Sequence, residues 1–220
     1  MRTAKTILTV IQERGKQKKP IERVYKLLFN RELYLNAYAK LYPNNGAMTK
    51  GVTDETVDGM SIQKIDRMIE ILREEKYQWK PARREYIKKK NGKKRPLGIP
   101  VWGDKVLQEV IRQILEAYYE PQFSEHSHGF RPNRGCHTAL QEIQVWKGTR
   151  WFIEGDISQY FDTIDHKILL EILARNIHDG RFIRLVSNML EAGYLEEWKF
   201  NQTISGVPQG GVISPILANI

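Results

Sequence analysis

The most constraining feature of the sequence is a pair of alternating runs, residues 84–88 and 95–100, on either side of Asn91-Gly92. In the first run Arg84, Tyr86 and Lys88 alternate with Glu85 and Ile87, and a period of two is typical of a strand. Asn-Gly is the pair favoured by two-residue hairpin turns, whose central residues need positive φ. The sequence therefore predicts an antiparallel hairpin near the middle of the chain.

On both sides of this hairpin, apolar residues recur at helical spacing. The expected helices run from Ile7 to Ile11, from Val24 to Tyr38, from Ile62 to Leu72, from Val106 to Leu115, and over residues 136–146, 166–175 and 182–190. Ser61 and Asp165 are suited to cap two of them. A strand is expected over residues 150–157. Helices interleaved with hairpins predict an α+β fold, not a regular series of βαβ units.

The composition favours a polyanionic partner without identifying it. Lys and Arg number 35 against 26 Asp and Glu, for a formal net charge of +9. Nucleic acid is the commonest partner for such a charge, an anionic membrane surface is second, and a merely basic surface is as compatible. Cys136 is the single cysteine, which excludes an intrachain disulfide and favours a reducing compartment. No apolar run reaches about 18 residues, so no membrane span is expected and the cytoplasm is the expected location.

The positive charge is concentrated in the predicted hairpin. Only Glu85 opposes the basic side chains of this region, which are Arg83, Arg84, Lys88, Lys89, Lys90, Lys93, Lys94 and Arg95. Lysines also protect exposed strand edges from aggregation, but a few are enough for that purpose. The excess therefore favours phosphate binding, in which arginine makes bidentate contacts and lysine acts as a point charge.

The apolar run over residues 150–157 carries Asp156 near its end, where the chain turns. A carboxylate in this position could bridge two Mg²⁺ ions, and the backbone carbonyl of Ile157 could serve as a further oxygen ligand. Asp is equally suited to cap the helix that follows. The local residues leave both interpretations open.

A glycine-flanked loop before residue 136 contains Arg131 and Arg134, and two arginines in a tight loop suit phosphate contact. The competing interpretation is a zinc site formed by His126, His128, Cys136 and His137. Structural zinc sites more often use cysteine-rich pairs, so phosphate contact is favoured.

Three separated motifs together resemble segments of group II intron reverse transcriptases. They are Tyr86–Pro100, Trp151–Asp162 and Gly206–Gly211, and they occur in the order and spacing of that family. Residues 128–136 and 46–59 are also similar to family segments that contact template or primer. The family usually has proline where this chain has Lys88. The resemblance implies an α+β fold with reverse-transcriptase fingers, an N-terminal helical extension and an incomplete right-hand polymerase palm.

The resemblance also implies roles for individual residues. Lys89 and Arg95 would hold the triphosphate of the incoming deoxynucleotide. Phe161 would exclude a 2′-hydroxyl, and Gln209 would contact the nucleotide or template. The implied contacts with RNA and template are Arg84, Lys93, Lys94, Arg131 and Arg134. Asp156 would be the catalytic metal ligand, Mg²⁺ the cofactor, and RNA-directed DNA synthesis with a role in intron splicing the activity.

The expected organisation is an N-terminal extension over residues 1–80, fingers over 81–150 and a partial palm over 151–220. The family continues with a Tyr-x-Asp-Asp hairpin, a thumb and a maturase domain. We therefore expect a stable fragment that binds intron RNA, template–primer and dNTP without polymerase activity. Apolar surface near residues 212–220 predicts a homodimer. The alternatives are a non-catalytic RNA-binding splicing factor and a retron or CRISPR-associated reverse transcriptase.

Overall fold

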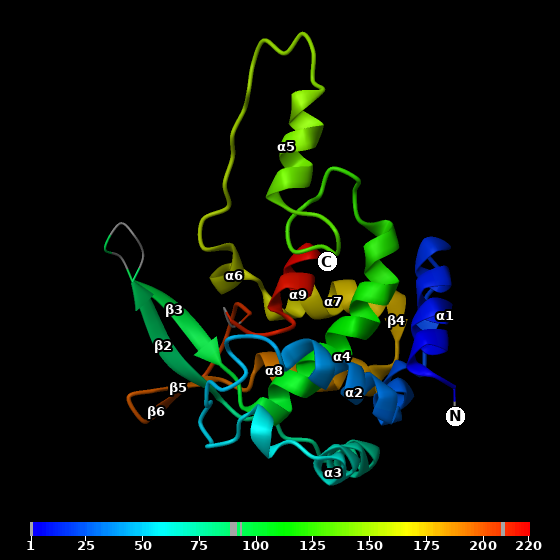
Figure 1. Ribbon diagram of the computed structural model, residues 1–220, viewed down its shortest axis with the longest axis vertical. Coiled ribbons are helices and arrows are strands. Elements are labelled where there is room, and N and C mark those ends of the chain that lie inside the picture. The colour runs from blue at the N-terminus through cyan, green and yellow to red at the C-terminus, as the bar shows by residue number, and fades with distance from the viewer. Residues whose placement is uncertain (1, 89–91, 93, 208–209) are drawn as a thin grey trace.

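The predicted hairpin extends from one side of a body built mainly of helices (Figure 1). The computed structural model describes residues 2–88, 92, 94–207 and 210–220. The predictions for Lys89, Lys93 and Gln209 lie outside these residues.

The helices and strands of the described residues have the following bounds. The helices are α1 (Ala4–Lys16), α2 (Arg31–Leu41), α3 (Ile62–Arg73), α4 (Trp102–Tyr119), α5 (Cys136–Gln144), α6 (Tyr160–Thr163), α7 (His166–Asn176), α8 (Gly180–Leu190) and α9 (Ser214–Asn219). The 3-10 helices are η1 (Val24–Phe29), η2 (Val57–Gly59) and η3 (Glu120–Gln122). The strands are β1 (Ile21–Glu22), β2 (Ala82–Lys88), β3 (Lys94–Ile99), β4 (Ile177–His178), β5 (Tyr194–Glu196) and β6 (Lys199–Asn201).

The hairpin forms one end of a sheet that a later segment completes. β2 and β3 pair antiparallel, from Arg83 opposite Ile99 to Lys88 opposite Lys94. β5 pairs in parallel with β2, and β6 pairs antiparallel with β5, so the order is β3-β2-β5-β6. β1 and β4 form a separate short parallel pair. The first two thirds of the chain and the last third therefore share one sheet.

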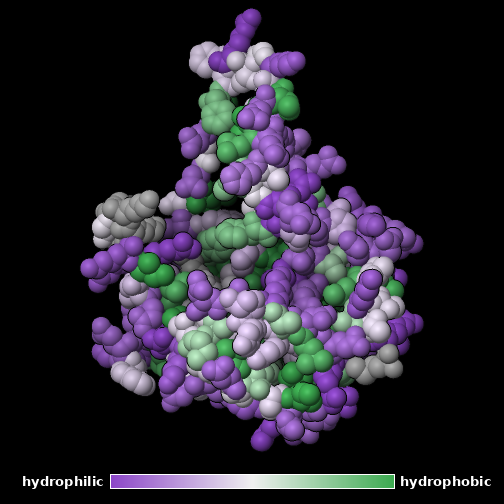
Figure 2. All heavy atoms as spheres, in the orientation of Figure 1, coloured by the Kyte–Doolittle hydropathy of each residue, from purple (hydrophilic) through white to green (hydrophobic). Residues whose placement is uncertain are grey.

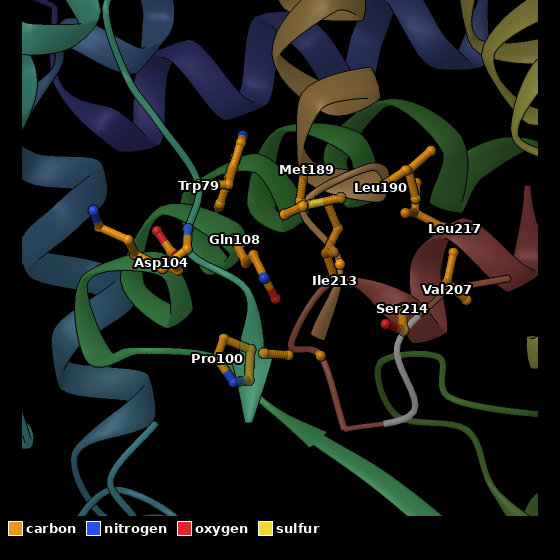
Figure 3. A pocket seen from close by; sticks show the side chains of 15 residues that line it. Trp79, Pro100, Asp104, Gln108, Met189, Leu190, Val207, Ile213, Ser214 and Leu217 are labelled. Atoms are coloured by element: carbon orange, nitrogen blue, oxygen red, sulfur yellow. The ribbon is translucent and has the colours of Figure 1, made fainter. Parts of the chain in front are cut away.

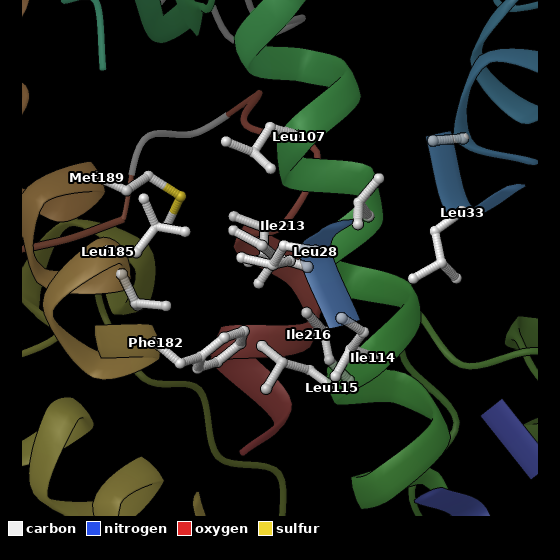
Figure 4. Packing of buried hydrophobic residues seen from close by; sticks show 14 of the residues in the cluster. Leu28, Leu33, Leu107, Ile114, Leu115, Phe182, Leu185, Met189, Ile213 and Ile216 are labelled. Carbon is white, nitrogen blue, oxygen red and sulfur yellow. The ribbon is translucent and has the colours of Figure 1, made fainter. Parts of the chain in front are cut away.

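The core surrounds α4, whose apolar side chains are fully buried along most of its length. Figure 4 shows Leu107, Ile114 and Leu115 facing side chains of α8 and α9 across this core. α1 packs closely on the same helix at Gly15, where a Cβ atom would lie 2.1 Å from the carbonyl oxygen of Tyr118. A side chain at this position would push the two helices apart.

The structure confirms the two paired strands of the hairpin and most of the expected helices, whereas Asn91 of the predicted turn lies outside the described residues. Both predicted caps are present: the Ser61 side chain accepts from the Lys64 N–H at 3.2 Å. The Asp165 side chain accepts from the Ile168 N–H at 2.9 Å. The single helix expected from Val24 to Tyr38 was wrong. Asn30 interrupts it, because its side chain caps α2 and leaves the preceding residues as η1.

The strand expected over residues 150–157 was also wrong. Residues 151–157 form neither helix nor strand, and Trp151 and Ile153 are 87% and 93% exposed. A strand needs a neighbouring strand for its backbone N–H and C=O groups, and within the described ranges none pairs with this segment. With α5, the segment belongs to a projection that stands out from the body in Figures 1 and 2.

The apolar surface expected near residues 212–220 is largely covered. Ile213, Ile216 and Leu217 are buried, because α9 packs against α4. Most of the apolar surface on which the homodimer prediction was based is therefore buried within the chain. In the part of the chain that the structure describes, no helix is long and apolar enough to cross a membrane.

Candidate functional site

The ends of β2 and β3 that lie nearest the hairpin turn present basic side chains to solvent. Lys88 and Lys94 lie directly opposite each other in the ladder, and both are exposed together with Arg95. Like charges in opposed positions destabilise a strand pair, and a bound anion relieves that repulsion. Neither lysine forms an ion pair with another described residue. These strand ends are thus suited to contact a phosphate group.

The two faces of the hairpin carry different arginines. Arg84 lies opposite Gly98, whereas Arg95 lies opposite Ile87, so the two arginines occupy opposite faces. The Arg84 guanidinium stacks on the ring of Tyr194 with its carbon 3.7 Å from the ring centroid. It lines a cavity of about 350 Å³. The structure therefore does not bring Arg84 and Arg95 to one phosphate-binding surface.

The glycine-rich turn near residue 206 packs against the segment that carries Phe161. The Gly206 N–H donates to the Ile164 carbonyl and the Val207 N–H to the Phe161 carbonyl, both at 2.8 Å. Gly206 has a φ of +84°, and a Cβ atom there would lie 2.8 Å from the Phe161 carbonyl oxygen. The close approach thus requires glycine.

The same turn packs against the hairpin at its other end. Gly210 has a φ of +101°, and a Cβ atom there would lie 2.5 Å from Leu97 Cδ1 and 2.9 Å from the Gly98 carbonyl oxygen. Two of the sequence motifs, the hairpin and the Phe161 segment, are therefore joined through the third.

Phe161 lies among aromatic rings at this junction. Its ring makes edge-to-face contacts with Phe130, at 6.3 Å between centroids, and with Tyr160, at 5.9 Å. The Tyr160 hydroxyl donates to the Ala218 carbonyl at 2.7 Å. Phe161 is partly buried against the core, whereas Phe130 is exposed. The steric role of Phe161 toward a sugar remains a prediction.

Arg131 organises its own loop in this structure. Its guanidinium is buried, donates to the Glu120 carboxylate at 2.9 Å, and donates to the carbonyls of Ser124 and Ser127 at 2.6 and 2.7 Å. Arg134 donates to the carbonyl of Glu125. Template contact by either arginine stays a prediction, and for Arg131, whose guanidinium is buried and engaged, it needs partial release of the loop.

The neighbouring histidines contact a carboxylate instead of forming a metal site. His126 and His128 both contact Glu142, the latter at 2.8 Å through Nε2. His128 Nδ1 lies 2.8 Å from the Thr138 hydroxyl. The hydrogen bonds from His128 and then His126 lower the pKa of Glu142. Among the described residues, no group of three or more His, Cys, Asp or Glu side chains could hold a metal ion, so the zinc interpretation has no support.

Asp156 lies in the exposed 151–157 segment and not at the end of a strand. The helix that follows is preceded by Gln159, so the alternative of Asp156 as its N-cap was wrong. Ile157 is 67% exposed. The described residues bring no cluster of carboxylates around Asp156, so they do not by themselves form a two-metal site. The assignment of Asp156 and the Ile157 carbonyl as Mg²⁺ ligands remains a prediction.

A row of buried polar side chains on α4 was not predicted from the sequence. Asp104 accepts from the Tyr77 hydroxyl at 2.6 Å and from the Lys80 N–H at 2.9 Å. Lys105 donates to two carbonyls of the loop near residue 46, and Gln108 accepts from the Val212 N–H at 3.0 Å. The available signal was the presence of charged and amide groups within an otherwise apolar helix face.

Burial shifts the pKa of two of these side chains, Asp104 and Lys105. It raises the pKa of Asp104 to about 6, against the opposing effects of hydrogen bonds from Tyr77 and Lys80. Burial, reinforced by the positive charge of Arg83, lowers the pKa of Lys105. Both side chains thus sit where an unsatisfied charge would be costly, and their hydrogen bonds fix the segments that they contact.

A small cavity lies where α4, α8 and α9 meet. Figure 3 shows Gln108, Met189, Leu190, Ser214 and Leu217 around it. Its volume of about 20 Å³ suits about one water molecule and excludes a nucleotide. A cavity of about 200 Å³ lies instead between the hairpin, the loop near residue 46 and the glycine-rich turn, lined by Thr49, Leu97, Lys105, Gly210 and Val212 among others.

Comparisons with known proteins show which family this chain resembles. Residues 87–220 match the family described as reverse transcriptase (RNA-dependent DNA polymerase). The group II intron-encoded protein LtrA of Lactococcus lactis subsp. cremoris is 51% identical over 200 residues, which cover 90% of this chain and 33% of that protein. Nuclear intron maturase 1, mitochondrial, of Arabidopsis thaliana is 36% identical over 93 residues, covering 42% of this chain and 13% of that protein.

A solved structure, the partial Cas6-RT-Cas1–Cas2 complex, matches with a TM-score of 0.58 at 20% identity, over 89% of this chain and 33% of that one. At this identity the likeness shows the fold alone. The chain spans about a third of the length of LtrA. The chain belongs to the reverse transcriptase family, and its sequence places it with the proteins that group II introns encode.

Proposed function

We propose that this chain forms the fingers and the first part of the palm of an RNA-directed DNA polymerase encoded by a group II intron. The observation that carries the proposal is the meeting of three separated motifs at one junction. Gly206 and Gly210 join the Phe161 segment to Leu97 of the basic hairpin through contacts that only glycine allows. A non-catalytic RNA-binding protein would have no need for the steric role toward a sugar that we propose for Phe161.

The proposed roles follow from the chemistry of the groups. Arg95 and Lys89 would bind the triphosphate of a dNTP, since guanidinium and ammonium groups are suited to that charge. Phe161 would lie against the sugar, and Gln209 would contact the nucleotide or template. Arg84, Lys93, Lys94, Arg131 and Arg134 would contact RNA.

Asp156 would contribute one carboxylate to a Mg²⁺ site. Mg²⁺, when bound, would polarise phosphoryl oxygens and activate the primer hydroxyl. Because the described residues supply no carboxylate cluster, we expect the chain alone to bind RNA without extending a primer. The division into an extension, fingers and partial palm at residues 80 and 150 is part of the same proposal.

Intron RNA is the proposed biological partner, and assistance to splicing the proposed second activity of the complete protein. The identity to LtrA, and the maturase named among the relatives, support this choice over a retron or CRISPR-associated reverse transcriptase. The structural likeness to the Cas-associated complex carries no argument about partners, because its sequence identity is 20%.

Titration of RNA binding by the chain tests the proposal. Fluorescence anisotropy with a single-stranded RNA oligonucleotide should show a logarithm of the association constant that falls linearly with the logarithm of salt concentration, by about 0.7 per phosphate contacted. The hairpin variant Lys88→Ala/Lys94→Ala should weaken binding and reduce this slope. Binding that is absent, or indifferent to salt, would refute an interface based on phosphate contacts.

A further inference from the structure

Phe130 has a backbone conformation that bulky residues rarely adopt. Its φ is +57°, in the left-handed region, where the Cβ atom of a residue other than glycine comes too close to the following carbonyl oxygen. The side chain gains little from burial in return, because it is 71% exposed. Such a conformation persists only where the surrounding structure imposes it.

The residues on both sides of Phe130 are held by side-chain hydrogen bonds. Before it, the Gly129 carbonyl accepts from Asn219 Nδ2 at the end of α9, at 2.9 Å. After it, the buried Arg131 guanidinium donates to the Glu120 carboxylate at 2.9 Å. Phe130 thus connects two anchored residues, and the contacts of its neighbours restrict its backbone dihedral angles.

In this conformation the Phe130 ring meets the Phe161 ring edge to face, with 6.3 Å between centroids and 85° between planes. Such a pair is favourable beyond the area that it buries, because the positive edge of one ring meets the negative face of the other. The core encloses Phe161 only in part. Tyr160 also contacts Phe161, but adjacent residues of a helix leave it on different faces. Among the described residues, Phe130 therefore supplies the ring from another segment that limits the movement of Phe161.

We propose that Phe130 is a positioning residue that holds the Phe161 ring in place for the selection of deoxynucleotides over ribonucleotides. The inference rests on the proposed function, in that it takes Phe161 as the side chain that excludes a 2′-hydroxyl. A ring can exclude so small a group only if it is held in position, because a slight rotation opens the space that the hydroxyl needs. Asn219 acts at one further remove, by holding Gly129 and with it the backbone of Phe130.

A purely structural role for Phe130 is the competing explanation, and substrate discrimination separates the two. Loss of folded protein lowers synthesis with both nucleotide types in the same proportion, so the ratio of their kcat/KM values stays the same. Loss of a contact that positions Phe161 raises kcat/KM for ribonucleotides relative to deoxynucleotides. The ratio is therefore the quantity to measure.

The experiment measures primer extension with each nucleotide type in a protein that contains this chain and has the full length of its curated relatives. Phe130→Asn removes the ring but keeps a residue that tolerates positive φ, whereas Phe130→Tyr keeps the ring. Asn219→Asp keeps the shape of the side chain and removes the N–H donor to Gly129. Trp198→Asn is the matched control, because Trp198 is an aromatic residue with a φ of +66° and 95% exposure, between β5 and β6.

Phe130→Asn and Asn219→Asp should each raise the ratio of ribonucleotide to deoxynucleotide kcat/KM about two- to tenfold, the range that corresponds to one aromatic pair. Phe130→Tyr and Trp198→Asn should leave the ratio at the wild-type value. An unchanged ratio in Phe130→Asn or Asn219→Asp, measured beside a Phe161→Ala variant whose ratio rises, would overturn the role of the residue replaced. An equal rise in Trp198→Asn would do the same for both. An unchanged ratio in Phe161→Ala would instead refute the proposed role of Phe161, and the inference with it.

Discussion

The Val207 N–H donates to the Phe161 carbonyl at 2.8 Å. This hydrogen bond joins the glycine-rich turn to the aromatic residue that we propose excludes a 2′-hydroxyl from the nucleotide site. The neighbouring Gly206 makes this contact possible, because its φ is +84° and a Cβ atom there would lie only 2.8 Å from the Phe161 carbonyl oxygen. The position of Phe161 therefore depends on a residue far along the chain.

Gly206→Ala should destabilise the protein more than Gly148→Ala does. Gly148 has a similar φ of +73°, but a Cβ atom there meets nothing within 4 Å. The control should lose about 1 kcal/mol from left-handed backbone strain alone. Gly206→Ala should lose a further 1–3 kcal/mol or so from overpacking. Denaturant unfolding measures both free energies, and equal losses would show that the close approach is not maintained in solution.

Asp104 should make folding stability depend on pH in the acidic range. Burial raises its pKa from 3.8 to about 6, so the folded state binds the proton more tightly than the unfolded state. The stabilisation is therefore complete below about pH 4 and is lost as the pH rises through about 6. Two pKa units correspond to roughly 3 kcal/mol.

Asp104→Asn removes this titration. The unfolding free energy of the wild type, relative to that of Asp104→Asn, should fall between pH 4 and pH 7 by an amount of this order. Urea unfolding at several pH values gives both curves. If the two proteins vary in parallel across that range, Asp104 has an ordinary pKa and is more hydrated than the structure implies.

Local periodicity was sufficient to predict the paired strands of the hairpin, most of the amphipathic helices and the caps at Ser61 and Asp165, because those features depend on residues a few positions apart. It could not predict which distant segments the polar side chains of α4 contact. Lys105 and Gln108 find partners 59 and 104 residues away, at Gly46 and Val212. No short-range pattern specifies such pairings, although polar groups on an apolar helix face signal that partners must exist.

Only part of the candidate site could be predicted, because its contacts between distant residues leave no short-range pattern in the sequence. The glycine-rich turn and Phe161 were each recognised from their motifs, and the structure brings them together. The prediction of phosphate contact by Arg131 rests on its loop setting and on the family resemblance, and neither could identify the nearby Glu120 that engages it. The 151–157 segment has the composition of a strand, but composition does not supply the neighbouring strand that it needs.

Association at high concentration should involve the exposed 151–157 segment. Trp151 and Ile153 are almost fully exposed, and large apolar side chains in an unpaired extended segment promote contact between copies. Trp151→Ser/Ile153→Ser should weaken dimerisation at least tenfold, since each buried side chain contributes about 1.5–3 kcal/mol. Ile204→Ser is the control, because Ile204 is exposed elsewhere. Sedimentation equilibrium that finds only monomers of the wild type would contradict this prediction.

Phe161→Ala should relax sugar selectivity in a protein that contains this chain and has the full length of its curated relatives. Removal of the ring opens the space where a 2′-hydroxyl would lie, so ribonucleotides should be incorporated while deoxynucleotides still support synthesis. Primer-extension rates with each nucleotide type measure the ratio. Tyr160→Ala is the matched control, because its hydroxyl contacts Ala218 at the surface of α9. An altered ratio in the control alone would move the steric role to Tyr160.

Primer extension on an RNA template by the same full-length protein, with and without Asp156→Ala, tests the polymerase assignment most directly. A carboxylate that holds metal ions for the chemical step should be indispensable for synthesis and nearly irrelevant to RNA affinity, which depends on the basic surface. We expect Asp156→Ala to abolish extension while its RNA dissociation constant stays within about twofold of the wild-type value. Extension by Asp156→Ala at the wild-type rate would contradict the assignment of Asp156 to the catalytic site and the polymerase interpretation built on it.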